Sequence, residues 1–159
     1  MRIETVRLIL REFTEDDYFR LFEYQNDPRY LQFYECNKKS KDEVLSLLQM
    51  IICWKNENPR IKYQLCIELK ESNLMVGNCG IRLNNTSDEI AEIGFELDPN
   101  YWKNGYMNEA LKSIIEFGKR DLGIKLIKAY CHPKNNNAIN AIMKLGFIKN
   151  KRIINMERK

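Results

Sequence analysis

The order in which strand and helix periodicities follow one another constrains the fold of this chain more than any other feature. Three consecutive segments alternate apolar and polar residues as half-buried strands do: 63–69, 75–83 and 90–97. Helix and strand patterns then alternate towards the C-terminus: helix 108–122, strand 126–131, helix 138–145, and a hairpin of 147–149 with 153–157. This order predicts an α+β fold, with a mixed and mostly antiparallel sheet of about seven strands and helices on both faces.

The N-terminal part adds one strand and two helices to this pattern. Residues 6–12 alternate as a strand, and a capping-box pattern at 14–17 precedes a helical segment whose apolar stripe includes Gln25. A second capping box, Ser40 with Glu43, opens a further amphipathic helix. No repeat or linker divides the 159 residues, so we expect a single domain over residues 1–159.

Composition excludes several classes of protein. The chain is 44% hydrophobic with a net charge of +4, which is too apolar for disorder and too weakly basic for a nucleic-acid binder. Its apolar runs are far shorter than the roughly 20 residues of a membrane span, and its first residues lack a signal-peptide pattern. Five scattered cysteines and one histidine argue against a disulfide framework and a metal centre. We expect a cytoplasmic protein that binds no metal, membrane or nucleic acid.

The segment between the third strand and the long helix is the most informative for function. A strand that ends at Asp98 leads into a short loop with Gly105, and the helix follows. The first turn of a helix has unpaired N–H groups and a positive dipole end, so a loop that approaches closely there suits a phosphate or pyrophosphate. The loop is neither a Walker loop nor a GxGxxG motif, and an ordinary turn is the simpler interpretation of one glycine.

The same segment and several others resemble the GNAT acyl-CoA N-acyltransferases, in particular the branch of the ribosomal-protein N-terminal acetyltransferases. The segments that carry the resemblance are Arg7–Arg11, Val76–Ile81, Ala91–Pro99, Tyr101–Leu111, Pro133–Ala138 and Lys144–Phe147. Each is loose alone, but their order and spacing are specific and span nearly the whole chain. The resemblance implies a sheet that is splayed in the middle and direct transfer of an acetyl group from acetyl-CoA to a primary amine in a ternary complex.

The resemblance also implies which residues bind acetyl-CoA. The pyrophosphate loop of the family, Gln/Arg-x-x-Gly-x-Gly/Ala, falls on residues 102–107, and the strand before it would pair its main chain with the pantetheine arm. Asn135 matches an asparagine that orients the cofactor, and it equally suits a helix N-cap. The implied cofactor-binding residues are Phe95, Leu97, Trp102, Lys103, Asn104, Gly105, Tyr106, Met107, Asn108 and Asn135. Lys103 and Met107 replace the usual glycine and alanine, so we expect Met107 to narrow the loop.

Transfer to an amine requires a base that removes the ammonium proton. The resemblance assigns this role to Glu92, which matches the catalytic glutamate of relatives that acetylate lysines, with Glu96 as the reserve base nearer the thioester. Two positions at which relatives carry a Tyr or Ser proton donor hold Ile142 and Ala138 instead. The remaining candidates for the donor are water, Tyr106, Cys131 and His132.

Two functions therefore stay open. The first is an enzyme whose acceptor is a peptide N-terminus, a polyamine, an aminoglycoside-like antibiotic or another small amine. The second is a non-catalytic or weakly active acyl-CoA-binding module, which the absent proton donors would explain. A homodimer formed by extension of the sheet is compatible with the final hairpin.

Overall fold

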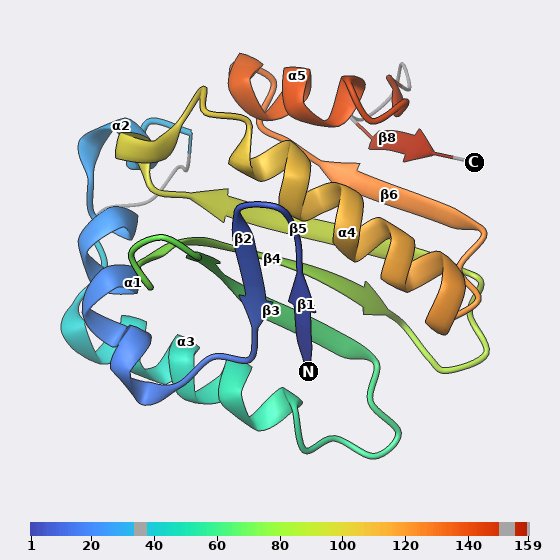
Figure 1. Ribbon diagram of the computed structural model, residues 1–159, viewed down its shortest axis with the longest axis horizontal. Helices are drawn as coiled ribbons and strands as arrows, with labels where there is room; N and C mark the ends of the chain where they lie inside the picture. Colours follow the sequence, from blue (N-terminus) through green and yellow to red (C-terminus); the bar gives the residue numbers. More distant parts are fainter. Residues whose placement is uncertain (34–37, 150–154, 159) are drawn as a thin grey trace.

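The computed structural model describes residues 1–33, 38–149 and 155–158. Its eight-stranded sheet has the order β1-β2-β3-β4-β5-β6-β8-β7 (Figure 1). The strands are β1 (Arg2–Glu4), β2 (Leu8–Arg11), β3 (Lys62–Leu69), β4 (Met75–Leu83), β5 (Ile90–Leu97), β6 (Leu126–Tyr130), β7 (Ile148–Lys149) and β8 (Asn155–Arg158). All neighbouring pairs are antiparallel except β5 and β6, which are parallel. The predicted α+β fold with a mixed, mostly antiparallel sheet is confirmed.

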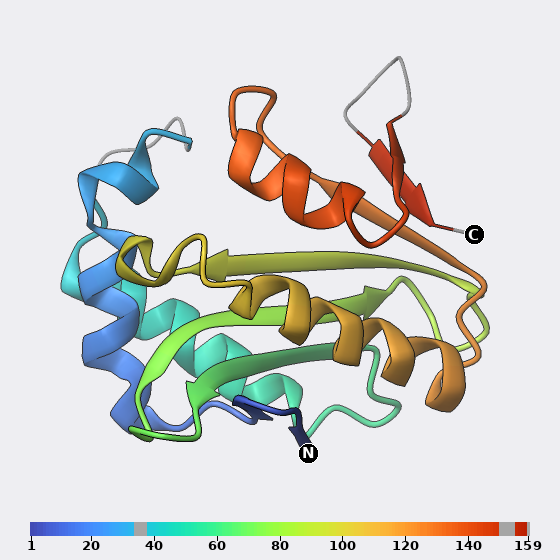
Figure 2. The same cartoon turned by 45° about the horizontal axis from the view of Figure 1, so that its top comes forward.

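Helices cover both faces of this sheet. They are α1 (Tyr18–Gln25), α2 (Pro28–Leu31), α3 (Lys41–Trp54), α4 (Tyr106–Asp121) and α5 (Asn136–Met143), with short 3-10 helices at Glu15–Asp17 and Pro99–Tyr101. Helix α4 crosses one face with α5 beside it, whereas α1 and α3 lie on the other face (Figures 1 and 2). The sheet is therefore the middle layer of three. None of the helices in the described ranges combines the length and the apolar character that a membrane span requires.

The two faces of the sheet carry different side chains because strand residues alternate. Leu65, Cys79 and Ile93 pack in the apolar core beneath α4, where the buried helix residues recur at helical spacing. Cys66 faces the opposite way, into the core formed with α1 and α3. The face towards α1 also receives the even-numbered residues of β5, which places Glu96 there and not in the core beneath α4.

The N-terminal strand differs from its prediction. Residues 6–12 were expected to form one strand, but the chain turns at residues 5–7 and forms two antiparallel strands, β1 and β2. Val6 lies in this turn with 89% of its surface exposed, although its place in the apolar alternation predicted a buried face. The extra strand raises the number of strands to eight, where the sequence predicted about seven.

Helix starts and the final hairpin show smaller differences. Helices α4 and α5 begin at Tyr106 and Asn136, slightly before the positions expected from the apolar pattern. A cap residue precedes each helix directly, Gly105 for α4 and Asn135 for α5, so each helix begins at the residue after its cap. The hairpin is present as β7 and β8, and residues 153 and 154 of its expected second strand lie outside the described residues.

The sheet opens between β5 and β6. Pairing of these two strands runs from Ile90 with Leu126 to Ile93 with Ala129, whereas β4 pairs with β5 as far as Leu97. Among the described residues, no strand therefore follows β5 on its β6 side beyond residue 93. This opening lies at the end of β5 from which the chain enters the loop before α4.

Candidate active site

The loop before α4 presents a row of backbone N–H groups. Gly105 is the N-cap of α4 with a φ of 80°, a left-handed conformation that favours glycine, and Lys103 is left-handed with a φ of 66°. The first α-helical bond runs from the Glu109 N–H to the Gly105 carbonyl at 3.1 Å, so the amides of residues 106–108 precede it. Because the positive end of the helix dipole lies at the same place, the loop suits a pyrophosphate.

Arg7, in the turn between β1 and β2, fastens this loop to the sheet. Its Nη1 donates to the Asn104 carbonyl at 3.0 Å, and its Nε donates to Glu109 Oε2 at 2.8 Å. Glu109 Oε1 also accepts from the Thr5 hydroxyl at 2.6 Å and from the Arg7 amide at 2.8 Å. Burial opposes ionisation, but these hydrogen bonds prevail and hold the pKa of Glu109 below its ordinary value. The loop is thus held by an ionised carboxylate on α4 and by the N-terminal turn.

Replacing Gly105 by Ala is expected to weaken coenzyme A binding. A Cβ there meets only Arg7 Nη2 at 3.5 Å, so the cost comes from the φ of 80°. That conformation costs an alanine about 1–2 kcal/mol, which corresponds to an affinity about 5- to 30-fold lower if the loop relaxes away from it. Calorimetric titration with coenzyme A measures the change.

Gly123→Ala is the matched control for this variant. Gly123 has a φ of 70° with nothing within 4 Å of its Cβ position, and it follows the far end of α4. It should lower the free energy of unfolding by a similar amount and leave the affinity for coenzyme A unchanged. If Gly105→Ala binds coenzyme A as tightly as the wild type, the loop does not hold the pyrophosphate.

The open edge of β5 presents further main-chain groups beside this loop. The Asp98 N–H bonds to the Val76 carbonyl of β4 at 2.8 Å, so the alternation of the ladder directs the main chain of Phe95 and Leu97 to the side where β6 has ended. The indole Nε1 of Trp102 donates to the Leu97 carbonyl at 2.8 Å. An extended ligand can add to the remaining groups as a strand would.

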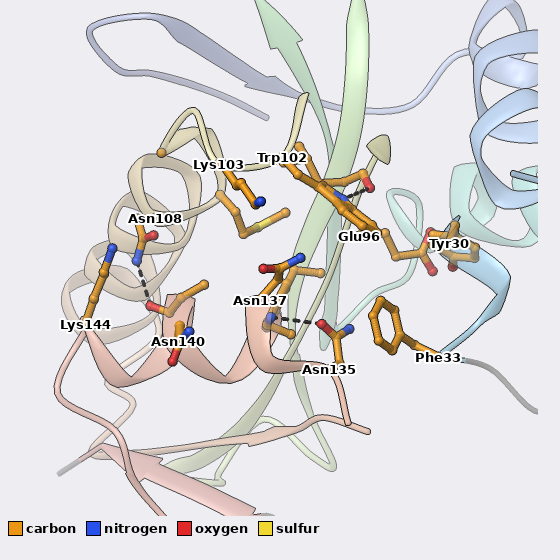
Figure 3. Close-up of a pocket in the computed structure, with 16 residues that line it drawn as sticks. Tyr30, Phe33, Glu96, Trp102, Lys103, Asn108, Asn135, Asn137, Asn140 and Lys144 are labelled. Atoms are coloured by element: carbon orange, nitrogen blue, oxygen red, sulfur yellow. Dashed lines mark hydrogen bonds between the residues drawn. The ribbon is translucent and has the colours of Figure 1, made fainter. Parts of the chain in front are cut away.

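A cavity of about 360 Å³ joins the loop, the edge of β5 and helix α5 (Figure 3). The predicted cofactor-binding residues that line it are Phe95, Leu97, Trp102, Lys103, Gly105, Met107, Asn108 and Asn135. The other two predicted residues do not line the cavity. Asn104 folds the loop through bonds to the carbonyls of residues 101 and 102, and Tyr106 packs beneath the Arg7 guanidinium at 4.5 Å.

Glu96 lines the same cavity from β5 (Figure 3). Its Oε2 accepts hydrogen bonds from Gln25 Nε2 at 2.7 Å, Asn78 Nδ2 at 3.1 Å and the Tyr24 hydroxyl at 3.2 Å. Burial, and then the Glu96 carboxylate, raise the pKa of Tyr24, which keeps its phenol protonated as a donor. Because all three donors bind Oε2, the other oxygen, Oε1, is the one suited to take a proton from a ligand.

Glu92 lies on the same face of β5 but outside this cavity. It is exposed and stands opposite Arg82 of β4 and Lys128 of β6. At roughly 3.3 Å per residue it is about 13 Å along the strand from Glu96. Of the two predicted carboxylates, Glu96 is the one at the open edge of β5, and it is the one that lines the cavity.

Asn135 serves as a cap and also lines the cavity. Its Oδ1 accepts from the Ala138 N–H at 3.0 Å as the N-cap of α5, and its side chain faces the other lining residues (Figure 3). The two interpretations that the sequence left open are therefore compatible. Ala138 lines the cavity with a methyl group, whereas Ile142 is fully buried in the core.

Cys131 and His132, two of the candidates for a proton donor, have different surroundings. Burial raises the pKa of Cys131 to about 11, so its thiol keeps its proton at neutral pH. His132 Nδ1 accepts from the Lys134 N–H at 3.2 Å, and the ring lies 6.5 Å from that of Phe33. Neither residue is among those that line the cavity. In the described ranges, no group of three or more His, Cys, Asp or Glu residues could hold a metal ion.

Several site residues were missed from the sequence. Tyr24, Gln25 and Asn78 surround Glu96, and Tyr30 and Phe33 form the wall of the cavity nearest α2. One signal was available: Gln25 occupies a position of the apolar stripe of α1 and is only 1% exposed. A buried amide needs hydrogen-bond partners, so a glutamine in such a stripe indicates a polar contact across the layers.

Known proteins with similar sequences and folds identify the family of this chain. The chain matches the family model described as an acetyltransferase (GNAT) domain over residues 7–148. YoaA of Bacillus subtilis, named an uncharacterized N-acetyltransferase, is 28% identical over 148 residues, which are 92% of this chain and 82% of YoaA. The structure of the ribosomal-protein-S5-alanine acetyltransferase from Vibrio fischeri aligns with a TM-score of 0.79 and 16% identity over 99% of this chain and 96% of that one.

A further solved structure of this fold contains acetyl-CoA. The microcin C7 self-immunity acetyltransferase MccE, in complex with acetyl-CoA and AMP, aligns with a TM-score of 0.76 and 16% identity over 97% of this chain and 93% of that one. The family match covers the loop before α4, the edge of β5 and Glu96. This protein belongs to the GNAT family of acetyl-CoA-dependent acetyltransferases.

Proposed function

We propose that the protein transfers an acetyl group from acetyl-CoA to a primary amine by direct attack in a ternary complex, with Glu96 as the general base. The observation that carries this proposal is the position of Glu96. Its carboxylate lines the cavity at the opening between β5 and β6, beside the loop that suits a pyrophosphate. An acyl donor held at both places would therefore have its reactive end near this carboxylate.

The residues around the cavity fit acetyl-CoA as the donor. The amides of residues 103–108 would hold the pyrophosphate, with Lys103 and Lys144 adding positive charge at the rim. The main chain of Phe95 and Leu97 would pair with the amide groups of the pantetheine arm, and Asn135 would lie beside it. Bound acetyl-CoA supplies an activated thioester. Met107, which is 8% exposed and lines the cavity, would restrict the space for the cofactor at the loop.

In this mechanism Glu96 accepts one proton from the acceptor amine. A primary amine is mostly an ammonium ion at neutral pH and cannot attack a carbonyl until it loses a proton. Three hydrogen bonds hold Oε2 in place, so Oε1 would be the oxygen that takes the proton of the acceptor amine. An amide N–H of the open strand would stabilise the oxyanion that forms. The leaving thiolate has an affinity for protons close to that of a cysteine, with a pKa of about 8.5, so we assign its protonation to water.

The second candidate function is a module that binds acyl-CoA without transferring it. It is favoured by Ala138 and Ile142, which replace the side chains that the resemblance expects as proton donors. Two measurements on the wild-type chain separate the candidates: calorimetric titration with acetyl-CoA, and coenzyme A release with peptide, polyamine and aminoglycoside acceptors. We expect binding and amine-dependent release. Tight binding without release on any amine supports the module, and absence of binding contradicts both functions.

A further inference from the structure

A series of hydrogen-bonded polar side chains connects Glu96 with Arg82. Arg82 lies near the C-terminal end of β4, whereas Glu96 pairs with Asn78 nearer its N-terminal end. Arg82 Nη2 donates to Gln64 Oε1 at 2.8 Å, and Gln64 Nε2 donates to Asn78 Oδ1 at 2.6 Å. Asn78 Nδ2 then donates to Glu96 Oε2 at 3.1 Å and to the Tyr24 hydroxyl at 2.7 Å. Arg82 itself is exposed, but Gln64 and Asn78 are each only 4% exposed. This series thus leads from the surface to the carboxylate through buried amides.

Both ends of this series of hydrogen bonds favour the same bond direction, because the Glu96 carboxylate only accepts and Arg82 only donates. A guanidinium has N–H donors and no acceptor, so Arg82 requires Gln64 to turn its oxygen outward and its NH₂ group inward. Gln64 then requires the oxygen of Asn78, which leaves the NH₂ group of Asn78 for Glu96. If Asn78 were reversed, its amide oxygen would face the carboxylate oxygen, and if Gln64 were reversed, its oxygen would face that of Asn78. A buried repulsion of either kind is costly.

The backbone is shaped to let these side chains lie flat on the sheet. A Cβ on Gly80 would stand 2.4 Å from Gln64 Oε1, and one on Gly94 would stand 3.4 Å from Arg82 Nη2. Gly80 is the direct partner of Gln64 between β3 and β4, and Gly94 is the partner of Gly80 between β4 and β5. A side chain at Gly80 would displace the amide that links Arg82 to Asn78.

A second cation is connected to Glu96 through one amide from the side of α1. Lys39 Nζ donates to Gln25 Oε1 at 2.8 Å, and Gln25 Nε2 donates to Glu96 Oε2 at 2.7 Å. Lysine is also a donor without an acceptor. Two cations that do not touch Glu96 therefore each turn an amide so that its N–H group points at the same carboxylate oxygen.

We propose that Arg82 is a positioning residue for the reaction, acting through Gln64 and Asn78 to hold Glu96 Oε2 and direct Oε1 to the acceptor amine. This inference rests on the proposed role of Glu96 as the base. Arg82 lies at the register position opposite Glu92, about 13 Å along the sheet from the level of Glu96, so it does not itself touch the acceptor. Its substitution should change the chemical step and not the binding of either substrate.

The first test compares Arg82→Glu with Arg82→Lys. Glutamate offers only acceptors and requires Gln64 to reverse, whereas lysine offers only donors and preserves the order. We expect Arg82→Glu to lower kcat by about 10-fold or more with both KM values within about twofold, and Arg82→Lys to retain most of the kcat. Lys128→Glu is the matched control, because it also places a negative charge next to Glu92 but lies on β6.

The second test is a double-mutant cycle with Gln64→Leu, which cuts the connection between Arg82 and Asn78. In that background Arg82→Glu should lower kcat no further, since the two residues act through one path. If Arg82→Glu does not fold, Arg82→Met removes the donor without adding a charge, and its loss of kcat should likewise vanish in the Gln64→Leu background. A merely structural role would lower kcat equally in both backgrounds.

The outcomes separate this inference from the proposed function. The inference is overturned if Arg82→Glu reduces kcat no more than Lys128→Glu does, or if the reduction persists fully with Gln64→Leu. Those results would leave Glu96 as the base if Glu96→Gln still abolishes turnover. If Glu96→Gln itself retains the wild-type kcat, the proposed role of Glu96 fails first.

Discussion

Replacing Glu96 by Gln is expected to lower kcat for acetyl transfer by about 10²- to 10⁴-fold, the range lost when a general base is removed. Glutamine has nearly the same shape, and its amide oxygen can accept from Gln25 and Asn78 as Oε2 does now. What it lacks is an oxygen that can take a proton from the amine. The fold and the affinity for acetyl-CoA should therefore remain. Steady-state release of coenzyme A and calorimetric titration with acetyl-CoA measure the two quantities separately.

Glu92→Gln decides between the two carboxylates that the sequence offered. Glu92 is exposed between Arg82 and Lys128 and outside the cavity, so its substitution should change kcat by no more than about twofold. The opposite pattern, a large loss with Glu92→Gln and none with Glu96→Gln, would assign the base to Glu92. Full activity in both variants would show that neither carboxylate removes the proton.

The Arg11→Met variant is expected to lose about 3–5 kcal/mol of unfolding free energy, because it leaves two carboxylates without their shared cation. Arg11 binds both oxygens of Asp17 at 2.8 Å each, and its Nε donates to Glu68 Oε2 at 2.6 Å. Asp17 and Glu68 are 4% and 9% exposed. The hydrogen bond with Asp17 raises the pKa of Arg11 although burial opposes this, so the guanidinium is charged at every working pH. Urea unfolding measures the loss.

Arg120→Met is the matched control for this effect. Its ion pair with Asp121 has side chains that are 80% and 41% exposed, so the loss should stay within about 0.5 kcal/mol. The triple variant Arg11→Met/Asp17→Asn/Glu68→Gln should recover part of the loss, because it removes the buried charges together with their cation. A deficit below about 1 kcal/mol for Arg11→Met would mean that water replaces the guanidinium at this site.

The elements of the fold could be predicted because their patterns are local. The alternation of β3, β4 and β5 and the apolar stripe of α4 each lie within one stretch of chain, and the structure has them where the sequence placed them. The turn at residues 5–7 was missed, because Val6 continues the alternation of the strand. The alternation of apolar and polar residues alone does not indicate that the chain has turned back to form a second strand, here β1 beside β2.

The candidate site could be predicted only in part, for the same reason. The loop at Gly105 and the strand with Glu96 are each recognisable from a short motif, and the structure brings both to one cavity. The residues that hold them are distant in the chain: Arg7 binds the loop from the N-terminal turn, and Gln25 reaches Glu96 from α1. No local pattern connects such pairs, because their contact exists only after the layers pack.

By itself, the sequence determined which faces of the strands and helices are apolar, where a helix N-terminus follows a glycine loop, and that two glutamates share one face of a strand. Only the tertiary structure separated those glutamates in space, because Glu96 lines the cavity and Glu92 does not. Residues on one strand face are equivalent in the pattern but not in space, because β6 ends beside residue 93 and leaves only the far part of β5 open. Glu96 stands at that opening, whereas Glu92 stands where the ladder is closed on both sides.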